Sequence, residues 1–192
     1  MDLNLRIRNY KKKGLLSENK RYKDIAESYL EKARNNLVAM QIDYKISVDE
    51  GIKKILEIAE FKEYDWVVVK GYYAMYIAVL ACLAKIGLKS ESHNASISAL
   101  DFYFVKKGKL EERYLGILKS VSLESEYVED LKVAKEDRID AQYEVSEEFQ
   151  KRKAEEMIDC AKKFVDRLER LFYEIKEEDK KEDGDENEKR DK

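Results

Sequence analysis

The sequence contains no proline, and only seven of its 192 residues are glycine. Proline and glycine are the residues that a helix interior tolerates least. Lys, Glu, Leu, Ala and Ile fill most positions instead, so local preference favours helix along almost the whole chain. This composition argues against a parallel-sheet enzyme, and the length fits one domain with or without tails.

Histidine and cysteine are also scarce, since the chain has one histidine, His93, and two cysteines, Cys82 and Cys160. A single histidine excludes the His/Cys cluster of a zinc site and the Glu-x-x-His pairs of a di-iron bundle. The sequence also lacks a glycine-rich phosphate loop. We therefore expect no metal and no cofactor, and we interpret each cysteine as a small hydrophobe within an apolar helical pattern.

Long apolar runs are missing too. The one candidate for a membrane span is "GYYAMYIAVLACLA", fourteen uncharged residues between Lys70 and Lys85 in a chain that is 41% charged. That length is too short to cross a bilayer and suits a buried core helix. The amino-terminal residues have no apolar region of the length that a signal peptide needs. We expect a cytoplasmic protein that makes no membrane contact.

The amino-terminal segment, residues 1–16, is basic. Residues 1–23 carry eight basic groups against two carboxylates, Asp2 and Glu18. A flexible, solvated arm is one interpretation of this segment, and a phosphate-binding arm is the other.

Apolar residues recur every three or four positions from Ser17, a candidate N-cap, to Tyr44, which predicts an amphipathic first helix. A central helix is predicted over 64–86, where Gly87 ends it. A long last helix with one apolar stripe is predicted over 146–176. Shorter helices are predicted within residues 48–61, 92–108, 109–121 and 126–145.

The fold class that follows is all-α, an up-and-down bundle of four to five helices formed by residues 17–176. The remaining residues, 177–192, are charged apart from Gly184 and Asn187. Such a segment cannot bury enough apolar surface to order itself, so it is predicted to be a disordered charged C-terminal tail.

The 64–86 helix is apolar on all sides, unlike the helices with one apolar stripe. Such a helix must be covered on most of its faces, so it is predicted to be the central helix of the bundle. Tyr72, Tyr73 and Tyr76 are large, rigid and amphipathic, as residues at association surfaces are. We therefore predict that part of this helix faces a second copy of the chain.

Two single residues stand out. Arg138 occupies a position where an apolar helical stripe calls for leucine, so it either forms an ion pair in the core or at an interface, with Asp137, Asp140 or a tyrosine hydroxyl, or it points to a phosphate. His93, near a predicted helix start, is either a capping or solvent-facing residue or a functional group that titrates near neutrality.

Three segments carry a resemblance to a known family: "YDWVVVKGYYAMYIAVLACLAKIGLKSESHNASI", then "FYFVKKGKL", then "DRIDAQYE" before a long closing helix. In this order they resemble the HEPN superfamily, the higher eukaryote and prokaryote nucleotide-binding domains. The resemblance is closest to the small stand-alone archaeal and bacterial branch, and it covers roughly residues 18–175.

This resemblance implies a bundle of four to five helices, usually a homodimer, often encoded beside a minimal nucleotidyltransferase as a toxin–antitoxin pair. Active members are metal-independent ribonucleases with an Arg-x4-6-His motif, in which both protomers contribute. Arg138 matches the arginine, and Tyr143, Glu144 and Val145 fill the histidine window. A phenol with a pKa of about 10 is a poor general base at neutral pH, so the catalytic motif is degenerate.

The charge around Arg138 also bears on RNA binding. Residues 124–148 contain ten carboxylates against three cations. A surface that neutralises RNA phosphates needs the opposite sign, so this region is expected to repel RNA and to attract a basic protein.

Three hypotheses remain. The first is a HEPN protein that acts as a dimer and as the partner of another protein, a minimal nucleotidyltransferase, without catalysis of its own. The second is a metal-independent ribonuclease toxin in which Arg138 and Tyr143, with His93, contact the scissile phosphate. The third is a regulator that binds a small nucleotide in the cleft between protomers.

Overall fold

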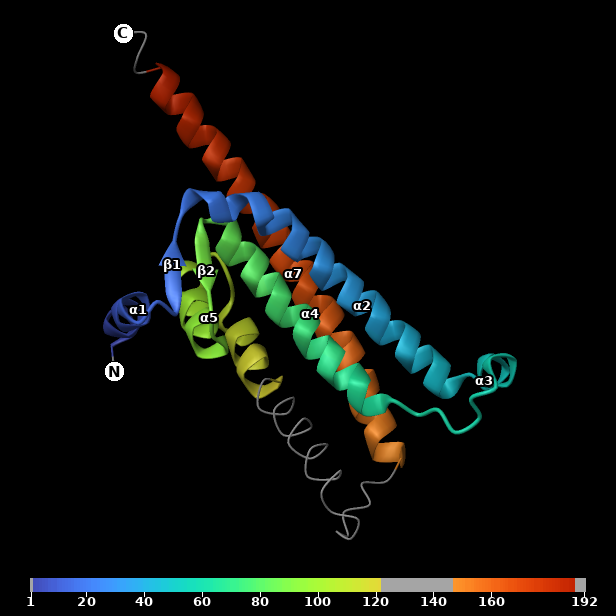
Figure 1. The fold of residues 1–192 in the computed structure, drawn as a ribbon. Helices are drawn as coiled ribbons and strands as arrows, with labels where there is room; N and C mark the ends of the chain where they lie inside the picture. The colour runs from blue at the N-terminus through green and yellow to red at the C-terminus, as the bar shows by residue number, and fades with distance from the viewer. Residues whose placement is uncertain (1, 122–146, 189–192) are drawn as a thin grey trace. The chain divides into compact units, whose positions relative to one another are not determined.

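The computed structural model describes residues 2–121 and 147–188, with side chains up to Ile175 in the second range. The described part of the chain is helical apart from one pair of short strands (Figure 1). Its elements are α1 (Leu3–Lys12), β1 (Leu16–Glu18), the 3-10 helix η1 (Lys20–Ile25), α2 (Ala26–Val48), α3 (Glu50–Leu56), α4 (Tyr64–Lys85), β2 (Leu88–Ser90), α5 (His93–Leu100), the π-helical turn η2 (Asp101–Val105), a helix over 112–121 and α7 (Glu147–Glu188). The predicted all-α fold class is confirmed.

The chain divides into two compact units. Unit 1 consists of Met1–Glu31, Ile77–Leu115 and Asp166–Lys192, and unit 2 consists of Lys32–Tyr76 and Gly116–Val165. Each unit therefore contains segments that lie far apart in the sequence.

In unit 2, segments of α2, α4 and α7 lie side by side (Figure 1). Gly71 of α4 lies at their contact, where an added Cβ would lie 2.4 Å from Cγ of Met157 on α7 and 3.0 Å from Sδ of Met40 on α2. Met40 is fully buried, and Met157 is 5% exposed. The absence of a side chain at Gly71 thus lets two flexible methionines fill the centre of this unit.

In unit 1, the second half of α4 packs against the second half of α7. The thiol of Cys82 donates a hydrogen bond to the Leu168 carbonyl at 3.3 Å, and the Lys85 ammonium lies 4.7 Å from the centre of the Phe172 ring. Phe172 and Leu168 are fully buried. The single apolar stripe predicted for the last helix therefore covers the central helix here, as a bundle requires.

Two short strands join the start of the chain to the end of α4. β1 pairs with β2 in antiparallel register, with Leu16 opposite Ser90. Just beyond the pair, the Asn19 backbone N–H donates to the Gly87 carbonyl at 2.9 Å. Gly87 has φ of +79°, a conformation that glycine adopts without strain, and this confirms it as the residue that ends the central helix.

The amino-terminal segment differs from its prediction as a flexible arm. Residues 3–12 form α1, which packs against α5 and η2 with Ile7 4% exposed. Leu16, at 1% exposed, anchors the following strand. The interpretation as a solvated arm was wrong because these two apolar side chains hold the segment on the core despite its many charges.

The predicted N-cap at Ser17 is also wrong. Ser17 lies within β1, paired with Lys89, and its hydroxyl donates to the Tyr22 hydroxyl at 3.1 Å. The capping residue is Asn19, whose side chain accepts from the Arg21 backbone N–H at the start of η1.

At the other end of the sequence, α7 begins at Glu147, one residue after the predicted start, and its backbone stays helical to Glu188. It thus continues past residue 176, where the last helix was predicted to end. The prediction that residues 177–192 form a disordered charged tail stays a prediction. The predicted helix over 126–145 lies outside the described residues.

By length and composition α4 is apolar enough to cross a membrane, with a mean hydropathy of 1.8 in its most apolar window. However, 78% of that window is buried within the protein. This is the burial of a core helix, as the sequence predicted.

Candidate functional site: an aromatic face on the central helix

Of the predicted catalytic residues, Arg138 and Tyr143 lie outside the described residues. His93 is the first residue of α5 and is partly buried. The helix is capped by Ser92, whose hydroxyl accepts a hydrogen bond from the Ala95 backbone N–H at 3.2 Å. The predicted helix start is confirmed, the cap is Ser92, and a catalytic role for His93 stays a prediction.

The tyrosines predicted at an interface differ in exposure. Tyr72 is 3% exposed and belongs to the core, whereas Tyr73 is 37% exposed and Tyr76 is partly buried. The Tyr72 ring lies 6.0 Å from the Tyr76 ring, nearly parallel to it, and 5.6 Å from the Tyr73 ring. Tyr72 is therefore the buried member of three neighbouring rings.

Sequence reasoning missed Trp66, which is 45% exposed on the first turn of α4. Trp66 precedes Tyr73 by seven residues, and two turns of helix place such residues on the same side. Tyr76 follows Tyr73 by three residues and borders the same side. We call Trp66, Tyr73 and Tyr76 the aromatic face; the spacing of seven between the first two was the signal that could have found it.

The aromatic face is unusual within its helix, because the residues between its members are buried. Val67 and Met75 are fully buried, and Val69 is 2% exposed. Burying one whole large apolar side chain contributes about 1.5–3 kcal/mol, so the exposed parts of Trp66 and Tyr73 would add a fraction of that on contact with a second surface. Exposed aromatics grouped in this way mark interaction sites more often than scattered single ones do.

An ion pair and a hydrogen bond fix α4 and α7 to α2 in unit 2. Lys70, one turn beyond Trp66, pairs with Asp43 of α2. One residue further along α2, the Tyr44 hydroxyl donates to the Glu155 carboxylate of α7. These contacts hold the helix that carries the aromatic face in a fixed orientation.

The environment of Tyr44 raises the pKa of its phenol. Burial, and then the hydrogen bond to Glu155, raise the pKa of the Tyr44 phenol to about 12. The Tyr64 ring lies 6.3 Å from the Tyr44 ring and adds a smaller effect in the same direction. Tyr44 therefore stays protonated at neutral pH and serves as a structural donor.

A further polar contact in unit 2 joins the segment before α4 to the start of α7. The Lys62 ammonium, before α4, lies 2.7 Å from the Glu147 carboxylate at the start of α7. Each group shifts the pKa of the other: that of Lys62 is raised and that of Glu147 is lowered. Both side chains are exposed to solvent, so this pair contributes little to stability.

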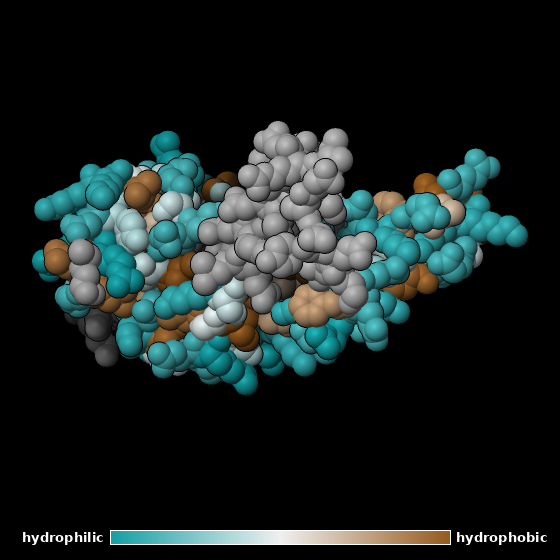
Figure 2. Space-filling model, turned by 90° about the horizontal axis from the view of Figure 1, so that it is seen from below, coloured by the Kyte–Doolittle hydropathy of each residue, from teal (hydrophilic) through white to brown (hydrophobic). Residues whose placement is uncertain are grey.

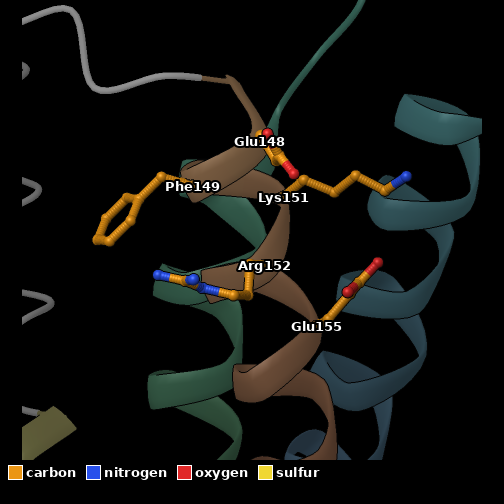
Figure 3. Close-up of a pocket in the computed structure, with 5 residues that line it drawn as sticks. All are labelled: Glu148, Phe149, Lys151, Arg152 and Glu155. Atoms are coloured by element: carbon orange, nitrogen blue, oxygen red, sulfur yellow. The ribbon is translucent and has the colours of Figure 1, made fainter.

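A surface hollow of about 590 Å³ lies along the first turns of α7 (Figure 3). It is lined by Glu148, Phe149, Lys151, Arg152 and Glu155. Figure 3 shows Phe149 and Arg152 on one side of the helix and Lys151 and Glu155 on the other. The Arg152 guanidinium lies 5.3 Å from the centre of the Phe149 ring. Because these side chains diverge, they do not form a convergent catalytic group.

On the face drawn in Figure 2, hydrophilic side chains predominate and apolar ones form smaller patches between them. Among the described residues, no three His, Cys, Asp or Glu side chains gather closely enough to hold a metal ion. The aromatic face is therefore the best-defined candidate for function in unit 2.

Comparison with known protein families gives one match. The family model for the HEPN domain matches residues 49–171 of this chain. The chain belongs to the HEPN domain family. Neither a curated protein nor a solved structure matches it.

The HEPN match covers some of the elements described above and leaves out others. It includes α3, α4 and the aromatic face, and it also includes Arg138 and Tyr143. It leaves out α1, β1, η1 and α2. The amino-terminal α1 thus lies outside the matched HEPN region.

Proposed function

We propose that this HEPN protein acts as a homodimer and as the binding partner of another protein, a minimal nucleotidyltransferase, in a cytoplasmic toxin–antitoxin pair. The observation that carries the proposal is the aromatic face on α4, where Trp66 and Tyr73 are exposed on an otherwise buried helix. Aromatic anchors of this kind are what association surfaces use.

The absence of strong catalysis is the second part of the proposal. Tyr143 stands five residues after Arg138, within the window where the family's ribonucleases carry histidine. A phenol does not accept a proton readily at neutral pH. The ten carboxylates in residues 124–148 also disfavour an approach by RNA and favour a basic protein surface.

Light scattering coupled to size-exclusion chromatography tests the dimer. Tyr73→Glu should convert a dimer to a monomer without unfolding it, because Tyr73 is already partly exposed. Tyr173→Glu, at a tyrosine of α7 that is 51% exposed, is the matched control and should leave the dimer intact. A wild-type monomer at all concentrations would remove the dimer from the proposal.

Copurification tests the partner. The protein encoded by the adjacent reading frame, if it is a minimal nucleotidyltransferase, should copurify with the wild-type chain when the two are coexpressed. Coexpression without copurification, at high salt and low salt alike, would contradict this part of the proposal.

A cleavage assay in the presence of a chelator separates the proposal from the ribonuclease alternative. The wild-type protein should cleave RNA weakly or not at all, and Tyr143→His should increase cleavage, since imidazole titrates near neutrality. Arg138→Ala is the control in both backgrounds. Robust wild-type cleavage that Arg138→Ala abolishes would favour the ribonuclease toxin instead.

A further inference from the structure

In unit 1, α1 and the turn over 106–109 meet at the side chain of Tyr103. The Lys107 ammonium lies 5.7 Å from the centre of the Tyr103 ring. Lys11 of α1 lies close to the Tyr103 hydroxyl, and α1 packs against both α5 and η2. Two basic segments that are about ninety residues apart in the sequence are thus brought to one place.

The spacing of the cations on α1 places three of them on one flank. Lys11 and Lys12 follow Arg8 by three and four residues, so each lies on the same side of the helix as Arg8, and all three are exposed. The neighbouring turn adds Lys106 and Lys107, which are also exposed. We call these five residues the α1 basic surface.

Few carboxylates offset this charge. Residues 3–17 contain no Asp or Glu. Glu18 pairs with Lys11 at 2.8 Å, and this contact is the main cause of the raised pKa of the Lys11 ammonium. The other four members of the surface therefore carry the charge that can meet an anionic partner.

Aromatic rings lie among these cations. The Phe102 and Tyr103 rings contact edge to face, with centres 4.9 Å apart, and both side chains are partly exposed. A protein surface that binds single-stranded nucleic acid has two components: cations that contact the phosphates, and aromatic rings among them on which the bases stack. An acidic peptide would use the charges but has no flat base to place on Tyr103.

We propose that the α1 basic surface binds single-stranded nucleic acid, with the sugar-phosphate chain along Arg8, Lys12, Lys106 and Lys107 and a base against Tyr103. Most of this surface is on α1, outside the matched HEPN region. The role proposed for it is binding alone, and it includes neither Arg138 nor Tyr143. The proposal therefore does not depend on whether the protein is a dimer, has a partner or cleaves RNA.

Fluorescence anisotropy with a labelled twelve-nucleotide uridine RNA, on the full chain, tests the proposal, and the same length of thymidine DNA identifies the preferred sugar. The Arg138→Ala background keeps the probe intact. With about four phosphates neutralised, the slope of log affinity against log salt is roughly −3, so affinity should fall about fiftyfold between 50 and 200 mM salt.

The test variant is Arg8→Gln/Lys12→Gln/Lys107→Gln, which should weaken binding by about tenfold or more and reduce the salt slope to about −1. The control is Lys32→Gln/Lys45→Gln/Lys54→Gln, which removes three exposed cations of α2 and α3 and should bind like the parent. Since all six side chains are exposed, both variants should fold, as circular dichroism will check.

Tyr103→Leu separates stacking from charge. It should weaken binding of the oligonucleotide severalfold and leave the affinity for a polyglutamate peptide unchanged. Binding of RNA alone, or of RNA and DNA equally, supports the proposal. It is overturned if the two triple variants bind equally well, or if polyglutamate binds as tightly as the oligonucleotide with the same salt slope, which would indicate an acidic protein partner.

Discussion

Gly71 of α4 faces Met157 of α7 so closely that a single added methyl group would lie 2.4 Å from Cγ of the methionine. Met40 of α2 closes the other side, with Sδ 3.0 Å from the same point. The position therefore cannot accept a side chain unless two helices or both methionines move.

Gly71→Ala should accordingly lower the free energy of unfolding by about 1–3 kcal/mol, the usual cost of overpacking a core, despite the better helix propensity of alanine. Gly116→Ala is the matched control, because an added Cβ at Gly116 meets nothing within 4 Å. It should stabilise the protein by up to about 1 kcal/mol. Urea denaturation followed by circular dichroism measures both; equal effects of the two substitutions would contradict the packing at Gly71.

Tyr44 predicts a pH dependence at the alkaline end. Its phenol has a pKa of about 12 in the folded protein and about 10 when unfolded, so the folded state holds the proton more tightly. The stability from this group is complete below pH 10 and is lost as the pH rises from about 10 to 12. Tyr44→Phe should flatten that part of the stability curve.

The control for this prediction is Tyr173→Phe, at an exposed tyrosine, which should leave the curve unchanged. Thermal unfolding at several pH values between 9 and 12 compares the three proteins. If Tyr44→Phe loses stability with pH as steeply as the parent does, other groups control the alkaline transition and Tyr44 does not.

Cys82 should be chemically inert in the folded protein. Its thiol is fully buried and donates to the Leu168 carbonyl, and burial raises its pKa well above the ordinary value. Since the thiolate is the reactive form, a thiol reagent should modify Cys82 only after denaturation. Cys160 is partly exposed and should react first. Mass spectrometry of the labelled peptides distinguishes the two, and early labelling of Cys82 would show that α4 and α7 separate easily.

Arg167 should stabilise unit 1 by fixing the turn after η2 onto α7. Its Nε donates to the Glu111 carboxylate at 2.9 Å, and its Nη2 donates to the Lys109 carbonyl at 2.8 Å. Its Nη1 is buried without a hydrogen-bond partner and lies 3.8 Å from the Glu174 carboxylate.

Arg167→Met removes both hydrogen bonds but also relieves the unpaired Nη1, so the net loss should be about 1–2 kcal/mol rather than the sum of two charge-assisted bonds. Arg170→Met, at an exposed arginine of the same helix, should change stability by less than about 0.5 kcal/mol. Chemical denaturation measures the free energy of unfolding of both variants and tests this difference. A loss at Arg170 equal to that at Arg167 would mean that the turn gains nothing from Arg167.

The helices could be predicted because their signals are long. The 64–86 helix is apolar on every side and ends at a glycine, and the observed α4 ends at Lys85, one residue before the predicted end. The two strands could not be predicted, because three residues are too few to show an alternating pattern. Ser17 was mistaken for a helix cap because a serine before an apolar pattern has the same sequence signal in either setting.

The aromatic face was only partly predictable for a related reason. Sequence alone marks Tyr72, Tyr73 and Tyr76 as a group, but neighbouring positions on a helix point in directions about 100° apart. Which of them meets solvent depends on where α2 and α7 pack, and the local pattern of this helix does not show that. Trp66 was missed because it precedes the uncharged stretch that drew attention to this helix.

The pairing of Leu16 with Ser90 has a consequence for the order in which the protein folds. A ribosome makes β1 more than seventy residues before its partner strand exists, so β1 cannot complete its ladder until β2 has emerged. Until then the apolar side chains of Ile7 and Leu16 have no core to cover them. The first part of the chain to be synthesised therefore cannot reach its native position until nearly half of the chain has been made, and a chain stalled before residue 88 would expose it to chaperones.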